Sequence, residues 1–170
     1  MSDKKLIGLA IVGCGTIGRI RAMMAKDYPG ISWIGLCDIN EELGKKLLND
    51  CDADFFTNDY NELVKRSEVN AVIIATDENH HFGPIMASLE NESSLFIEKP
   101  LATDLVESRD VLNKTKSTNV DAVLGYTQRF RRRFLAVKQK LIDQKIGHVT
   151  SVVTRAFMNS MVPIATVRRT

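Results

Sequence analysis

Residues 13–18 read Gly13-Cys14-Gly15-Thr16-Ile17-Gly18, and the segments on either side decide which fold they belong to. Residues 6–12 before them are apolar, as a strand buried in a parallel sheet requires. Residues 19–26 after them space apolar side chains as one face of a helix does. Another apolar run, residues 31–37, ends at Asp38. Strand, glycines, helix, strand and terminal acid in this order predict a doubly wound α/β sheet.

The three glycines of this segment each have a separate role in a phosphate-binding turn. Gly13 permits the tight turn, Gly15 lets a diphosphate approach the main chain, and Gly18 lets the helix pack closely on the strand. The amides of Thr16, Ile17 and Gly18 open the helix without partners inside it, at the positive end of its dipole. A diphosphate supplies the missing acceptors and charge. The segment therefore predicts a dinucleotide site, with a purely structural glycine turn as the alternative.

Asp38 predicts which dinucleotide is bound. Its carboxylate would accept hydrogen bonds from the 2′ and 3′ hydroxyls of the adenosine ribose, and it would repel a 2′-phosphate. Residues 39–42 contain no Arg or Lys that would offset this repulsion. The sequence therefore favours NAD over NADP.

Composition narrows the class of protein. A chain of 170 residues supports one complete domain and part of another. The charged fraction of 26% excludes a membrane protein, and the net charge of +2 is too small to indicate nucleic acid as a partner. The three cysteines are odd in number and lack metal-ligand spacing, so we expect reduced thiols, a cytoplasmic location and no metal site.

The rest of the chain alternates strands and helices. We expect strands at 54–57, 70–76, 94–97 and 121–125, and helices at 40–51, 59–66, 82–89 and 103–117, two of them capped by Asn40 and Thr103. With the first two strands this gives a six-stranded doubly wound parallel sheet. Residues 149–156 also look like a strand. Unpaired, such a strand exposes its edge, so we expect self-association or a partner chain there.

Polar residues follow the strands that end near residues 75 and 97, and here the chain resembles a known family. Residues 98–102, Glu98-Lys99-Pro100-Leu101-Ala102, are similar to the E-K-P-L-A signature of the glucose-fructose oxidoreductase / inositol dehydrogenase / MocA family. Ala75-Thr76 and His81 fall where that family has A-T-P-x-x-x-H. Residues 125–130 and 146–149 resemble its lead into an interdomain helix and its I-G-x-V entry to a second domain. The resemblance spans nearly all of residues 5–155.

The resemblance implies an NAD(P)-dependent dehydrogenase that acts on a secondary alcohol of a polyol, inositol or sugar. It places Lys99 near the nicotinamide C4, where it helps move the substrate hydroxyl proton, and it has Glu98 hydrogen-bond the nicotinamide ribose. It implies that Pro100, after a cis peptide bond, orients Lys99. It also implies that His81 packs against the nicotinamide half of the cofactor. A non-functional alternative stays open for each of two residues: Lys99 is an ordinary surface lysine, and His81 is a packing residue.

Two further residues complete the site that the resemblance implies. Thr76 belongs with the residues that bind the cofactor. Arg129 belongs near the substrate cleft, whereas the neighbouring arginines 131–133 are expected on the solvated first turn of a helix.

The chain also departs from the family pattern. Asp77-Glu78 stands where the family has Pro-Asn, and no Gly-Gly turn followed by an Asp and a His comes after Gly147. We therefore expect a NAD-binding domain at 1–125 and, at 126–170, the interdomain helix and first strand of an incomplete substrate or oligomerisation domain. Two functions follow: part of a dehydrogenase, as an N-terminal fragment or subunit, or a catalytically incomplete NAD-binding module or sensor. Expected partners are a small polyol or sugar substrate and a second copy or partner chain, without nucleic acid or membrane.

Overall fold

The computed structural model describes residues 6–155 of the chain, in two compact units that are taken separately and that divide between Tyr126 and Thr127. In the first unit strands and helices alternate. The strands are β1 (Ile7–Val12), β2 (Ile31–Cys37), β3 (Phe55–Thr57), β4 (Ala71–Ile74), β5 (Ser94–Ile97) and β6 (Ala122–Leu124). The helices are α1 (Thr16–Lys26), α2 (Glu41–Cys51), α3 (Tyr60–Val64), α4 (Phe82–Glu90) and α5 (Leu105–Ser117), with a 3-10 turn η1 (Glu78–His80) before α4.

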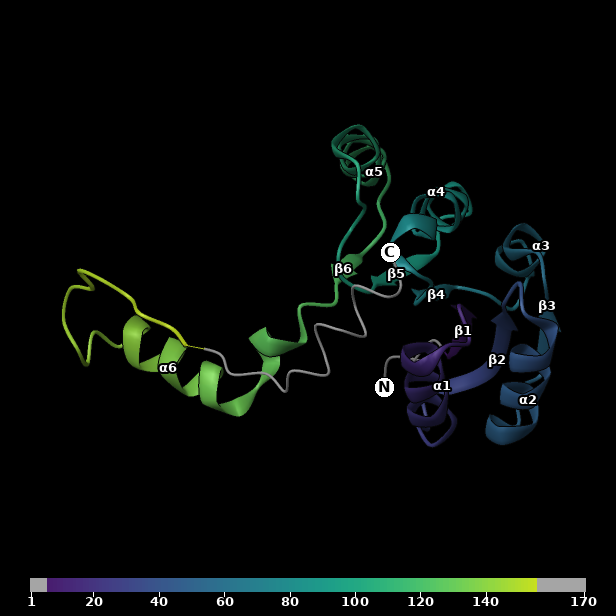
Figure 1. Cartoon of the computed structure of the whole chain (residues 1–170), viewed down its shortest axis with the longest axis horizontal. Coiled ribbons are helices and arrows are strands. Elements are labelled where there is room, and N and C mark those ends of the chain that lie inside the picture. Colours follow the sequence, from purple (N-terminus) through teal and green to yellow (C-terminus); the bar gives the residue numbers. More distant parts are fainter. Residues whose placement is uncertain (1–5, 156–170) are drawn as a thin grey trace. The chain divides into compact units, whose positions relative to one another are not determined.

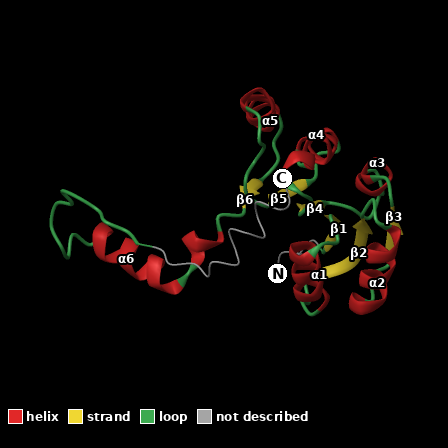
Figure 2. Ribbon diagram, viewed as in Figure 1, coloured by secondary structure: helices red, strands yellow, loops and turns green. Residues whose placement is uncertain are grey.

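The strands form one parallel sheet in the order β3-β2-β1-β4-β5-β6. In Figure 1 helices α1 and α2 cover one face of this sheet, and α3, α4 and α5 cover the other. Figure 2 shows the same layering by type of element, with the strands between two layers of helices. The strand order reverses between β1 and β4, and in open α/β sheets ligands bind beyond the carboxyl ends of the strands at this switch point. The predicted doubly wound fold is confirmed.

The central strands are buried on both faces, which explains their continuous apolar sequence. Ala10 and Val12 of β1 belong to a core cluster with Ile85 and Leu89 of α4. The intervening Ile11 belongs to a second cluster with side chains of α1 and α2. Because neighbouring side chains of a strand point to opposite faces, β1 joins both halves of the core and fixes where the turn that follows it emerges.

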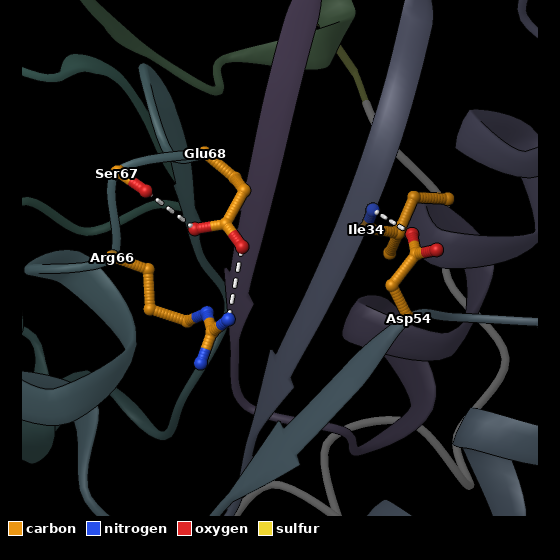
Figure 3. A network of polar contacts seen from close by, with 5 residues as sticks. All are labelled: Ile34, Asp54, Arg66, Ser67 and Glu68. Atoms are coloured by element: carbon orange, nitrogen blue, oxygen red, sulfur yellow. Dashed lines mark hydrogen bonds and ion pairs between the residues drawn. The ribbon is translucent and has the colours of Figure 1, made fainter.

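Charged groups stabilise the amino-terminal side of the sheet. The Asp54 carboxylate accepts a hydrogen bond from the Ile34 amide at 2.8 Å, which joins the chain before β3 to β2 (Figure 3). Arg66 donates to Glu68 at 2.9 Å, and its guanidinium lies 4.1 Å from the centre of the Phe55 ring. This network precedes β3 and β4, so it lies at the opposite ends of these strands from the candidate site.

Of the two predicted helix N-caps, one is confirmed and one is wrong by one residue. Asn40 caps α2 as predicted, accepting a hydrogen bond from the Leu43 amide at 3.1 Å. The cap of α5 was predicted at Thr103 and is Asp104, whose carboxylate accepts from the amides of Val106 and Glu107. Both residue types can cap, and Asp104 does so because α5 begins one residue later than the sequence suggested.

The second unit contains a 3-10 turn η2 (Thr127–Phe130) and helix α6 (Arg132–Ile142). The strand predicted at 149–156 is wrong for residues 149–155, which form no strand; residue 156 lies outside the described residues. A strand exists only with a partner in a ladder, and no described segment pairs with these residues. Along residues 6–155 no helix is both long and apolar enough to cross a lipid bilayer.

Candidate functional site

The turn between β1 and α1 depends on two glycines and leaves a third facing open space. Gly13 has φ of +99°, and a Cβ atom there would lie 2.5 Å from the Ala75 carbonyl oxygen. A Cβ atom on Gly18 would lie 1.7 Å from the Gly13 carbonyl oxygen. A Cβ atom on Gly15 would meet no atom within 4 Å. Gly13 and Gly18 are thus required by the protein itself, whereas Gly15 leaves room for something outside it.

The amides that open α1 are available for a ligand. Gly15 is the N-cap residue of this eleven-residue helix, and it has no side chain that could accept their hydrogen bonds. Within the described residues, the amides of Thr16, Ile17 and Gly18 donate to no protein acceptor. The first turn also carries no acidic residue. Unpaired donors at a positive dipole end, beside open space, fit a phosphate group.

Asp38 is held beside this turn. One carboxylate oxygen accepts from the Cys14 amide at 2.6 Å, and the other accepts from the Asn40 amide at 2.8 Å. The Asp38 carbonyl also accepts from the Asn58 side chain at 2.7 Å. A carboxylate oxygen has two lone pairs, so both oxygens can accept one more hydrogen bond each. The carboxylate is therefore orientated in advance for a diol such as a ribose.

Cys14 fills the inside of the turn. Its thiol is buried and donates to the Cys37 carbonyl at 3.7 Å. Burial, together with the nearby charge of Asp38, raises the pKa of Cys14 to about 12. A thiol with this pKa stays protonated at neutral pH, and a protonated thiol is a poor nucleophile. Cys14 therefore packs the turn rather than reacting there.

The chain after β4 lies against the glycine turn. A Cβ atom on Gly13 would touch the Thr76 amide nitrogen, so the two loops are in van der Waals contact. The Thr76 hydroxyl oxygen is buried and has no hydrogen-bond partner among the described residues. Buried hydroxyl groups in proteins are nearly always hydrogen-bonded. This unpaired hydroxyl beside the phosphate turn is a second observation that fits a bound ligand.

His81 joins the loop after β4 to the loop after β5. Its side chain is almost fully buried, with 1% exposed. The Nδ1 atom lies 2.8 Å from the Pro100 carbonyl oxygen, and Nε2 lies 3.2 Å from the Thr76 carbonyl oxygen. Both ring nitrogens thus face backbone acceptors, so the imidazole fixes two loops rather than presenting a free nitrogen.

The Glu98-Lys99-Pro100 segment leaves β5 at the same edge of the sheet. The Glu98 amide donates to the Ile74 carbonyl at 2.9 Å, which extends the pairing of β4 and β5 by one residue. Lys99 is exposed, and the Lys99–Pro100 peptide bond is cis. The Glu98 carboxylate forms an ion pair with Arg21 of α1, a residue that lies outside the motifs of the sequence.

The fold therefore brings most of the predicted site residues together. The ends of β1, β2, β4 and β5 meet at one edge, and they carry the glycine turn, Asp38, Thr76 and the segment 98–100. Arg129 lies in η2 of the second unit and stays a prediction. No group of three or more His, Cys, Asp or Glu side chains within residues 6–155 is arranged to hold a metal ion.

The chain is similar to several known proteins. The family model described as an oxidoreductase family with an NAD-binding Rossmann fold matches residues 7–126. Myo-inositol 2-dehydrogenase of Thermotoga maritima is 26% identical over 149 residues, which are 86% of this chain and 45% of that protein. The 2,7-anhydro-N-acetylneuraminate hydratase of Mediterraneibacter gnavus is 28% identical over 145 residues, 85% of this chain and 38% of that protein.

A solved structure shows the same fold. The scyllo-inositol dehydrogenase of Lactobacillus casei, crystallised with NAD(H) and scyllo-inositol, superposes with a TM-score of 0.81 at 23% identity, over 86% of this chain and 44% of that one. The chain spans less than half the length of these proteins. Because the family model covers more than half of the chain, this protein belongs to the glucose-fructose oxidoreductase / inositol dehydrogenase / MocA oxidoreductase family through its NAD-binding Rossmann domain.

Proposed function

We propose that this chain binds NAD at the edge formed by β1, β2, β4 and β5, and that it supplies the cofactor half of a dehydrogenase for polyols or sugars. The observation that carries the proposal is the turn at residues 13–18, where three unpaired amides open α1 beside a glycine that faces open space. The adenosine ribose would lie on Asp38 and the diphosphate on Gly15, Thr16 and Ile17. The unpaired Thr76 hydroxyl would face the middle of the cofactor.

The nicotinamide half would lie toward the end of β5. NAD, when bound, accepts a hydride ion from the carbon of a secondary alcohol. Lys99 would take the proton of that hydroxyl group, since it is exposed at the strand end where the nicotinamide ring is expected. Glu98 would accept a hydrogen bond from the nicotinamide ribose, and Pro100 together with His81 would hold the backbone that carries the lysine.

The preference for NAD gives a first test. We expect the unmodified chain to bind NADH at least about tenfold more tightly than NADPH, because a 2′-phosphate would meet the Asp38 carboxylate. Asp38→Ala should weaken NADH binding about tenfold. Asp38→Asn keeps an acceptor for the Cys14 amide but removes the charge, so it should narrow the gap between the two cofactors. Calorimetric titration with both cofactors measures this, and equal affinity of the unmodified chain for NADH and NADPH would contradict it.

Turnover is the second test, and it separates the two candidate functions. Binding of NAD and turnover of a substrate are separate properties, so they are measured separately. Purified chain is incubated with NAD and a panel of inositols, other polyols and sugars while NADH absorbance is followed. If NADH forms, Lys99→Met should abolish its formation and leave NADH binding unchanged, with Lys65→Met, an exposed lysine of the α3 end, as the matched control. NADH binding without NADH formation identifies the binding module.

The relatives also bear on the substrate. Two of the three named above are inositol dehydrogenases by name, and the third is a hydratase of an anhydro sugar acid. A hydroxyl-rich ring is common to these names, so we propose a polyol or sugar as substrate. We further propose that residues 126–170 begin the substrate and oligomerisation domain, with Arg129 near the cleft and a second copy or partner chain bound there. The three free, buried cysteines suit a reducing compartment such as the cytoplasm.

A further inference from the structure

The ion pair between Arg21 and Glu98 joins two segments that are far apart in the sequence. Arg21 lies in the second turn of α1, and Glu98 directly follows β5. The Nε atom of Arg21 donates to Oε1 of Glu98 at 3.0 Å, and a terminal guanidinium nitrogen donates to the same oxygen. The two side chains are only 23% and 12% exposed. An ion pair this sheltered is screened less by water than a surface pair, so it can fix geometry.

A second contact fixes the guanidinium itself. It lies 4.9 Å from the centre of the Phe96 ring. Phe96 and Glu98 are two residues apart on an extended segment, so their side chains point to the same face of the sheet. The Arg21 guanidinium therefore packs on the Phe96 ring and pairs with the Glu98 carboxylate. The position of its backbone is set by the packing of α1.

The pair leaves half of the carboxylate free. Both donors of Arg21 reach Oε1, and Oε2 accepts no hydrogen bond from any described residue. A carboxylate whose one oxygen is fixed presents the other in a single direction, without the entropy cost of choosing a rotamer on binding. We propose that Arg21 is a positioning residue that aims Oε2 of Glu98 at the nicotinamide ribose and so anchors the nicotinamide half of the cofactor. This inference rests on the proposed function.

The test compares two ligands that differ in the nicotinamide half. NADH carries the second ribose, whereas ADP ends at the diphosphate and reports only on Asp38 and the glycine turn. We expect Arg21→Met to weaken NADH binding about tenfold and to leave ADP binding within about twofold, as the loss of one hydrogen bond from a well-orientated charged group would. Arg21→Lys retains the charge but lacks the rigid, planar guanidinium group, so its NADH affinity should lie between those of Arg21→Met and the unmodified chain.

The controls use a matched ion pair and a double variant. Arg19 of the same helix pairs with Asp50 of α2 at 2.8 Å, and it is half exposed. Arg19→Met should change neither affinity. Glu98→Gln should lower NADH affinity as Arg21→Met does, and the double variant should bind NADH no more weakly than the weaker single variant, because both changes remove one contact.

The remaining outcomes distinguish failure of the inference about Arg21 from failure of the proposed function. Equal losses of NADH and ADP affinity in Arg21→Met, an unchanged NADH affinity, or additive losses in the double variant would each overturn the inference while leaving the proposed function intact. Binding of neither NADH nor ADP by the unmodified chain would overturn the proposed function and the inference together. Circular dichroism of each variant identifies any that fails to fold, and in that case Arg21→Lys and Glu98→Gln decide between the outcomes above.

Discussion

Gly18→Ala is expected to lower the free energy of unfolding by about 3 kcal/mol or more, in the range of severe overpacking. The added Cβ atom would lie 1.7 Å from the Gly13 carbonyl oxygen, which is main chain and cannot rotate away as a side chain can. Relief requires α1 to move off the end of β1, and this contact is part of the packing of α1 on the sheet. Chemical denaturation followed by circular dichroism measures the loss.

Gly15→Ala is the matched control in the same turn. A Cβ atom at Gly15 meets no atom within 4 Å, so the free energy of unfolding should fall by no more than about 1 kcal/mol, the cost of alanine at an N-cap. The same methyl group would occupy the space through which a diphosphate approaches the amides, so NADH affinity should fall. Equal stability of the Gly15→Ala and Gly18→Ala variants would contradict the packing that we describe for this turn.

His81→Leu should both destabilise the protein and weaken NADH binding. The leucine has nearly the same volume, but it removes the imidazole N–H group, which faces the Pro100 carbonyl oxygen at 2.8 Å or, in the other tautomer, the Thr76 carbonyl oxygen at 3.2 Å. A buried acceptor left unpaired costs about 1–3 kcal/mol, so we expect a loss of stability in this range. Denaturation and NADH titration of the same variant measure the two effects.

The neighbouring histidine provides the control. His80 ends the 3-10 turn η1 and is exposed, so His80→Leu should change stability by less than about 0.5 kcal/mol. His81→Gln keeps an N–H donor on a side chain of different shape, and should fall between the leucine variant and the unmodified chain. A His81→Leu variant as stable as the unmodified protein would show that the imidazole does not bridge the two loops.

The sheet could be predicted from the sequence because each strand is a short apolar run bounded by polar residues. Residues 31–37 and 94–97 were predicted with the bounds that the structure shows. The strand order follows from the glycine turn, since a doubly wound sheet begins at its centre and reverses there. Helix starts were less certain, because at α5 two adjacent residues, Thr103 and Asp104, are both good caps and only the backbone decides between them.

Contacts across the sheet could not be predicted in the same way. Arg21 and Glu98 are 77 residues apart, and their pairing requires the knowledge that the Arg21 side chain of α1 reaches the end of β5. The only signal in the sequence was a basic residue in the helix after the glycines and an acid before Lys99, each ordinary alone. His81 illustrates the same limit: its position relative to Thr76 was clear, but its bond to Pro100 depends on how the loop after β5 returns.

The two edge strands of the sheet, β3 and β6, have three residues each, and each pairs with one neighbour alone. Of the two, β6 is less buried, because Ala122 and Val123 are exposed whereas Thr57 of β3 is buried. Edges of this kind open first in thermal fluctuations, and amide hydrogen exchange reports them as the fastest part of a sheet. The two ends of the proposed cofactor site therefore differ in stability: the proposed adenosine end adjoins the better-buried edge strand β3, whereas the proposed nicotinamide end adjoins the exposed edge strand β6. As temperature rises, we therefore expect binding of the nicotinamide half of NAD to weaken before binding of the adenosine half.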